Sequence, residues 1–127
     1  MKILLDTHAF LYLSQDAALL GRRAWKLIRR RPAEVYLSVC SIWEMAIKTK
    51  LGRLELDVPL ERAVEAGIGS GLRLLDLRKE AIYRTMTLDM THRDPFDRIL
   101  AAQALVEEMT IISKDAAFDA WGVVRAW

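Results

Sequence analysis

Residues 1–8 read MKILLDTH, a short apolar run that stops abruptly at an acid. Residues 3–5 are too few to form a helix and are apolar on both faces, which is typical of a central strand in a parallel sheet. Asp6 then stands at the carboxyl end of that strand, where an unpaired buried carboxylate would be strongly destabilising. This stretch predicts an α/β fold and an acid that needs a partner.

Short strands and helices continue to alternate along the chain. Further strands are predicted at residues 34–38, 72–77, 110–113 and 123–127. Helices are predicted at residues 8–14, 17–31, 41–51, 59–67, 79–88, 94–108 and 116–121. The alternation favours a three-layer α/β/α fold, in which helices cover both faces of a mainly parallel sheet of four to five strands.

The composition is that of a globular protein, and we expect a single domain over residues 1–127. Hydrophobic residues make up 53% of the chain and charged residues 28%. The single cysteine, Cys40, excludes an internal disulfide framework and favours a buried thiol in a reducing cytosol. No apolar run approaches the roughly 20 residues of a membrane span, so a soluble, cytoplasmic protein is expected.

The net charge of +2 is too small to indicate nucleic-acid binding by itself. Basic residues nevertheless cluster at residues 22–31, and Arg22, Lys26, Arg29 and Arg30 follow helical spacing. Such a stripe could track a nucleic-acid backbone, but a solvated helix face is the simpler interpretation.

Four acids occupy corresponding places in the predicted fold. Asp6 follows the first strand, Glu44 lies just after the second, Asp97 is in the first turn of the helix at 94–108, and Asp115 follows the strand at 110–113. In open α/β sheets the functional crevice lies outside the carboxyl ends of the strands. We therefore expect the four carboxylates to converge at one edge of the sheet.

Most of these acids also have a structural explanation when taken singly. Ser41 and Glu44 have the spacing of a capping box, Asp94 and Asp97 bracket a helix start, and Asp115 could cap the helix at 116–121. As a set, however, like charges repel unless a cation lies among them. Oxygen ligands suit Mg²⁺ or Mn²⁺, and the chemistry indicated is metal-assisted phosphodiester cleavage, which needs no nucleophilic side chain.

Four longer stretches carry a family resemblance, in the family's order and over nearly the whole chain. They are LLDTHAFLY at residues 4–12, SVCSIWEMAIKTKLGRL at 38–54, HRDPFDRILAAQALVEE at 92–108 and TIISKDAAFDAWGV at 110–123. Together they resemble the PIN-domain ribonucleases of the VapC toxin type. The resemblance implies a PIN-like fold and a divalent-metal-dependent endoribonuclease acting as the toxin of a toxin–antitoxin pair. It further implies a homodimer and a cognate antitoxin protein that covers the site.

The same resemblance assigns roles to individual residues. Asp6, Glu44 and Asp97 correspond to the family's core metal-binding acids, and Asp115 corresponds to its fourth, more variable one. Thr7 stands where the family often has a hydroxyl beside the first acid, and Asp94 matches an outer acid that orients ligands or water. Tyr12 replaces the family's usual Trp, and SKD at residues 113–115 replaces Thr-x-Asp; neither change removes a carboxylate.

Several other side chains near these motifs have two interpretations. Lys48 follows Glu44 by one helical turn, so it predicts either a simple ion pair or a contact to a substrate phosphate. His92 could touch the substrate, although neither it nor His8 has the spacing of a metal ligand and a metal-activated water needs no imidazole base. Trp25 and Trp43 are expected to pack in the core rather than to stack on bases.

Two other classes of function compete with the nuclease. A phosphoryl-transfer enzyme of the haloacid-dehalogenase type would also begin with an acid after the first strand, but it needs a second Asp where this chain has His8. A non-catalytic PIN-like module that binds nucleic acid or protein is the other alternative, and the presence of all four acids argues against it. The RNA target, the number of metal ions and the antitoxin are left open by the sequence.

Overall fold

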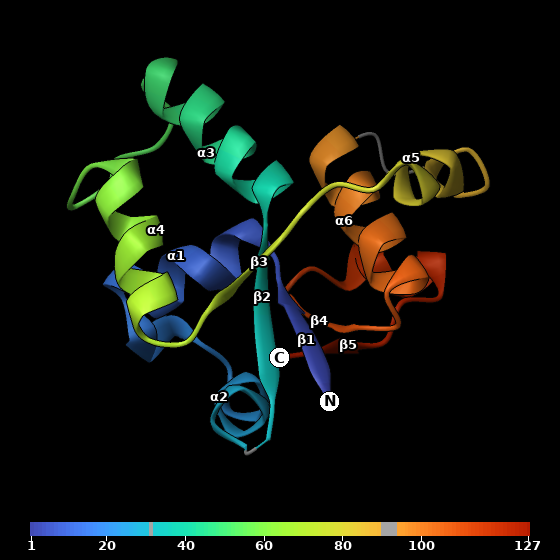
Figure 1. The fold of residues 1–127 in the computed structure, drawn as a ribbon, viewed down its shortest axis with the longest axis horizontal. Coiled ribbons are helices and arrows are strands. Elements are labelled where there is room, and N and C mark those ends of the chain that lie inside the picture. The colour runs from blue at the N-terminus through green and yellow to red at the C-terminus, as the bar shows by residue number, and fades with distance from the viewer. Residues whose placement is uncertain (31, 90–93) are drawn as a thin grey trace.

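A computed structural model describes residues 1–30, 32–89 and 94–127, and it is built on a five-stranded sheet (Figure 1). The strand order is β3-β2-β1-β4-β5, and all four pairings are parallel. The strands are β1 (Lys2–Leu5), β2 (Glu34–Ser38), β3 (Arg73–Leu75), β4 (Thr110–Ile112) and β5 (Arg125–Ala126). The predicted α/β fold with a parallel central sheet is confirmed.

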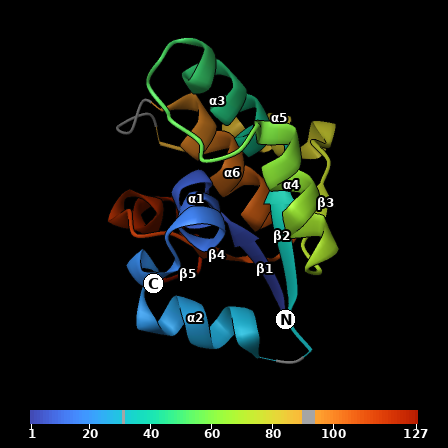
Figure 2. The ribbon, with the colours of Figure 1, turned by 90° about the vertical axis from the view of Figure 1, so that its left-hand side faces the viewer.

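Helices cover both faces of this sheet (Figures 1 and 2). One face carries α1 (Thr7–Gln15), α2 (Arg22–Arg29), α3 (Val39–Lys50), α4 (Leu60–Gly69) and the short 3₁₀ helix η1 (Ala17–Leu19). The other face carries α5 (Lys79–Thr85), α6 (Pro95–Val106) and the 3₁₀ helix η2 (Ala116–Trp121). The result is the three-layer arrangement expected from the sequence. No described helix is long and apolar enough to cross a membrane.

The apolar run of β1 supplies both layers of the core. Ile3 and Leu5 belong to the cluster that packs against α1, α2, α3 and α4, whereas Leu4 belongs to the cluster that packs against α5, α6 and η2. All three side chains are fully buried. A strand apolar on both faces is explained by helices on both faces, because alternate side chains point to opposite sides of a sheet.

The prediction of a single helix over residues 17–31 is wrong. The segment forms η1 and then α2, and between them Leu20 and Gly21 have extended backbones. Chain packing explains the break, since a Cβ on Gly21 would lie 2.4 Å from the backbone carbonyl carbon of Trp127. The backbone is held away from helical geometry so that the last residue of the chain can pack on the glycine.

The start of α3 also differs from the prediction. Ser38, at the end of β2, is the N-cap, and its hydroxyl accepts a hydrogen bond of 3.0 Å from the N–H of Cys40. The predicted capping box of Ser41 and Glu44 is therefore wrong, because both residues lie inside the helix and are buried. The predicted end is confirmed, since Gly52 adopts the left-handed φ of +72° that favours glycine after a helix.

Candidate active site

The candidate site lies at the carboxyl ends of the neighbouring strands β1 and β4, whose adjoining helices α1 and α6 lie on opposite faces of the sheet. After β1 the chain enters α1 on one face, and the neighbouring strand β4 is reached through α6 on the other face. The backbone N–H of Asp6 donates a 3.1 Å hydrogen bond to the carbonyl of Ile112, which holds the two strand ends together. Such a topological switch point is where open parallel sheets place their binding crevices.

Asp6 is a buried carboxylate with a like charge nearby. It is 5% exposed and acts as the N-cap of α1, with one carboxylate oxygen accepting a 2.7 Å hydrogen bond from the N–H of Ala9. Burial raises the pKa of Asp6 from 3.8 to about 6, and the negative charge of Asp97 adds to the rise. Hydrogen bonds from Ser113 and Ala9 partly oppose it. Asp97, from a distant part of the sequence, is thus close enough to act on Asp6.

Glu44 is held between a hydroxyl and an ammonium group. It is 3% exposed, and the hydroxyl of Thr7 donates a 2.6 Å hydrogen bond to its Oε1. Lys48 Nζ lies 2.6 Å from its Oε2 in an ion pair along α3. Thr7 directly follows Asp6, so its hydroxyl fastens α3 to the start of α1 and fixes Glu44 beside the end of β1.

Lys48 is the cation among the acids. Its hydrogen bond with Glu44 raises the pKa of the ammonium group, burial opposes the rise, and the negative charges of Glu44, Asp94 and Asp97 add to it. The predicted ion pair with Glu44 is present. Asp94 and Asp97, at the start of α6, therefore also lie close enough to act on the charge of Lys48.

The first turn of α6 positions two of the predicted acids. Asp94 is the N-cap, and its carboxylate accepts hydrogen bonds from the N–H groups of Phe96 at 2.9 Å and Asp97 at 3.4 Å. Pro95 takes the first helical position, where its missing N–H has no cost. Capping by Asp94 leaves Asp97 on the turn that approaches Asp6 and Lys48.

Asp115 stands at the exposed margin of this group. Its carboxylate accepts a 2.9 Å hydrogen bond from the N–H of Ala117 and so caps η2, as the sequence allowed. Its own N–H donates to the hydroxyl of Ser113 at 3.0 Å, and the Ser113 side chain also hydrogen bonds to Asp6. Ser113 thus links the two acids. Sequence reasoning missed this role, although a polar residue directly after an apolar strand was its signal.

The acids agree with a hard divalent cation in kind but are not assembled around one. Carboxylate and hydroxyl oxygens are the donors that Mg²⁺ and Mn²⁺ prefer. Within residues 1–30, 32–89 and 94–127, however, no three His, Cys, Asp or Glu side chains are grouped so that they could hold one ion. Both oxygens of Glu44 are engaged by Thr7 and Lys48. His92, a further predicted contact, lies outside the described residues.

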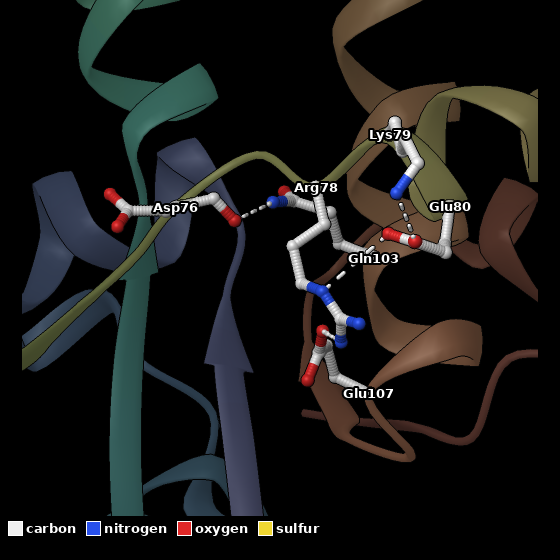
Figure 3. A network of polar contacts seen from close by, with 6 residues as sticks. All are labelled: Asp76, Arg78, Lys79, Glu80, Gln103 and Glu107. Atoms are coloured by element: carbon white, nitrogen blue, oxygen red, sulfur yellow. Dashed lines mark hydrogen bonds and ion pairs between the residues drawn. The ribbon is translucent and has the colours of Figure 1, made fainter.

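A buried amide fixes α6 against the strand ends. Gln103 is almost fully buried, accepts a 2.6 Å hydrogen bond from the hydroxyl of Ser38, and donates to the carbonyl of Asp76 at 3.3 Å. Figure 3 shows this amide reaching Asp76 beside the ion pairs that join Arg78 to Glu80 of α5 and to Glu107, which follows α6. Gln103 therefore ties α6 to the carboxyl ends of β2 and β3. Sequence reasoning missed it, because a glutamine on an otherwise apolar helix face is not distinctive.

Two predictions about surface side chains have opposite outcomes. Trp43 was expected in the core, but it is 64% exposed and makes an edge-to-face contact with Phe96, with ring centroids 5.5 Å apart. Trp25 is partly buried in the core cluster, as predicted.

The basic side chains of α2 are exposed, and that helix lies at the amino ends of the strands, away from Asp6 (Figures 1 and 2). The stripe therefore does not adjoin the acids.

The family model described as the PIN domain matches residues 3–123. Among curated proteins, no sequence matches this chain.

Solved structures that resemble the chain over nearly its whole length are bacterial toxins and toxin–antitoxin complexes. VapBC2 from Rickettsia felis, bound to a DNA fragment from its promoter, has a TM-score of 0.75 at 12% identity and covers 99% of this chain and 98% of its own. VapBC-1 from nontypeable Haemophilus influenzae has a TM-score of 0.70 at 17% identity, covering 99% and 97%. VapC20 from Mycobacterium tuberculosis, which cleaves the sarcin–ricin loop, has a TM-score of 0.65 at 18% identity, covering 96% of each chain. At these identities the likeness establishes the fold.

Proposed function

The chain belongs to the PIN-domain family, and on that premise we propose that it is a divalent-metal-dependent endoribonuclease and the toxin of a cytoplasmic toxin–antitoxin pair. The observation that carries this proposal is the buried carboxylate of Asp6, whose pKa is raised by burial and by the neighbouring charge of Asp97. Two acids brought together at the switch point of a parallel sheet are costly to keep ionised without a cation. A bound Mg²⁺ or Mn²⁺ would offset the repulsion between the two acids, which gives an enzyme a reason to keep them together.

Each acid has a part in the proposed site. Asp6, Glu44 and Asp97 would hold the cation, and Asp115 would join them from the exposed margin. When bound, Mg²⁺ or Mn²⁺ would supply the positive charge that offsets these acids, activates a water and stabilises the leaving oxygen of a phosphodiester.

The remaining polar groups have supporting parts. Thr7 orients Glu44 through its 2.6 Å hydrogen bond, and Asp94 orients Asp97 by capping the same helical turn. Lys48, once released from Glu44, would contact a phosphate oxygen. These side chains position groups rather than react, in keeping with the electrostatic character of phosphodiester cleavage.

The proposed partners follow from family membership and from the neighbours of similar fold. Among those neighbours is a toxin–antitoxin complex from Klebsiella pneumoniae, and three others are bound to DNA. We propose that this chain is a homodimer and that it binds a cognate antitoxin protein that covers the acids. Size-exclusion chromatography with light scattering, performed with the chain alone and co-expressed with the product of an adjacent gene, tests both parts.

Cleavage of total cellular RNA is the direct test of the activity. The purified chain should cleave in Mg²⁺ or Mn²⁺ and stop when a chelator is added, and mapping of the new ends should reveal the target. Asp97→Asn should reduce the cleavage rate by a factor of about 100 or more, because it removes the charge of a proposed metal ligand at a half-buried position. Glu65→Gln, which neutralises an exposed acid of α4, is the matched control and should keep full activity.

The competing functions predict other results. Undiminished cleavage by Asp97→Asn in a nuclease-free preparation would refute the proposed site. RNA binding without any cleavage in either metal would favour a non-catalytic PIN-like binding module. The haloacid-dehalogenase alternative has lost its support, since the chain matches the PIN family model over residues 3–123.

A further inference from the structure

The feature that the proposed function leaves unused is an exposed tryptophan beside the acids. Trp43 precedes the buried Glu44 on α3, yet 64% of its surface is open to solvent. Trp25 and Trp121, in contrast, pack into the two core clusters. Most of the indole surface is therefore available for contact with a ligand.

The indole is braced by a residue of the second helix of the site. Its ring meets that of Phe96 edge to face, with centroids 5.5 Å apart and planes inclined by 77°. Phe96 lies in the first turn of α6, between the capping acid Asp94 and Asp97. An edge-to-face contact occupies at most one face of the indole, so at least one face is left for a flat ligand.

The surroundings of Trp43 distinguish a nucleotide from an apolar protein side chain. Lys48, further along the same helix, is an ammonium group that lies 2.6 Å from Glu44, and Lys50 beyond it is exposed. Trp43 directly precedes Glu44, and Phe96, whose ring touches the indole, directly precedes Asp97, so this flat apolar surface has charged residues as its sequence neighbours on both helices. A base with its phosphate carries the same two features, whereas a protein interface centre is depleted of charge.

We propose that Trp43, braced by Phe96, is a platform on which one unpaired RNA base stacks beside the phosphodiester that is cleaved. The inference rests on the proposed nuclease function and adds to it a residue that recognises the substrate. A base held inside a duplex presents only its edges, so a stacking platform selects RNA whose bases are free, such as a loop or a single strand. Trp43 would then be a specificity-determining residue, and the acids would act on whichever bond the stacked base brings to them.

Binding can be tested separately from cleavage. In an Asp97→Asn background with Mg²⁺, end-labelled oligouridylate and oligoadenylate of roughly ten nucleotides should bind in fluorescence-anisotropy titrations, and Trp43→Ala should weaken their binding about 5- to 150-fold. Trp43→Phe keeps a smaller aromatic surface and should lose less. Tyr83→Ala removes another exposed aromatic side chain, on α5, and should bind as the parent does. A pre-formed RNA duplex of equal length should bind weakly to the parent and show no difference on Trp43→Ala.

Cleavage by the chain with its acids intact provides the second measurement. Trp43→Ala should lower kcat/KM for single-stranded RNA by a similar factor while its circular dichroism spectrum and melting temperature stay those of the parent. Equal binding and cleavage by Trp43→Ala and the parent would overturn the inference and leave the nuclease standing. A parent that binds through Trp43 but never cleaves would instead refute the nuclease and leave the platform. Loss of binding to a co-expressed protein partner, with RNA binding unchanged, would also overturn the inference and make Trp43 a protein contact.

Discussion

The raised pKa of Asp6 has a measurable consequence for stability. A carboxyl whose pKa is about 6 when folded and 3.8 when unfolded stabilises the fold fully below pH 3.8, and that contribution is lost as the pH rises through 6. The loss amounts to about 3 kcal/mol. Asp6→Asn keeps an acceptor for the helix cap without the charge. In urea titrations with chelator, the variant should be more stable than the parent at pH 7.5, and the two should converge at pH 4.

A parallel pH dependence in the parent and in Asp6→Asn would contradict this account. Cleavage should meanwhile be lost in the variant at every pH, because the ligand charge is gone. A gain in stability together with a loss of activity would identify Asp6 as a residue kept for function at the expense of the fold.

The hydroxyl of Thr7 offers a second prediction about a single residue. Thr7→Val keeps the shape but removes the donor to Glu44, so a buried carboxylate oxygen loses its partner. We expect unfolding free energy to fall by roughly 1–3 kcal/mol and cleavage to fall as Glu44 loses its orientation. Thr7→Ser restores the donor and should recover most of both quantities. Equal activity of the Val and Ser variants would show that Glu44 is positioned without Thr7.

At the scale of a helix, Asp94 can be tested for two roles at once. Its carboxylate caps α6, and its charge acts on Lys48. Asp94→Asn keeps the cap but removes the charge, whereas Asp94→Ala removes both and should cost about 1 kcal/mol of stability. If cleavage falls in both variants while only Ala is destabilised in thermal melts, the charge matters for activity. If only Ala affects cleavage, Asp94 is a cap and nothing more.

The sequence predicts most elements because their signals are local. The apolar run of β1, the Asp-Pro start of α6 and the glycine after α3 each depend on neighbouring residues, and each is confirmed. The failures come from contacts between distant segments. The break before α2 depends on Trp127 packing on Gly21, which no pattern within residues 17–31 reveals.

In the candidate site too, local patterns predict some positions, and contacts between distant segments determine the others. The positions of Asp6, Asp94 and Asp97 follow from strand ends and helix starts, so they could be predicted. The clamp of Thr7 on Glu44 joins residues 37 apart in sequence, and the bond of Ser38 to Gln103 joins residues 65 apart. Such pairs are set by how helices pack across the sheet, and a single sequence carries no direct signal for them.

For the whole molecule, a cation that binds only the folded chain should raise its stability by mass action. At a concentration 100 times the dissociation constant the gain is about 2.7 kcal/mol, or roughly 10 °C in melting temperature for a chain of this size. Differential scanning fluorimetry with increasing Mg²⁺ or Mn²⁺ should detect the shift in the parent. The shift should be absent in a variant carrying both Asp6→Asn and Asp97→Asn, and an equal shift there would locate the metal elsewhere.

The position of β1 at the centre of the sheet also determines when the acids of the proposed site can come together during synthesis. Ile3 pairs with Val35 on one side and with Thr110 on the other. Strand β1 therefore cannot be paired on both sides until β4 has been synthesised. At about 5–20 residues per second, translation separates Asp6 from Asp97 by roughly 5 to 20 seconds. The acids of the proposed site therefore stay apart until the segment that carries Asp97 and β4 has been translated.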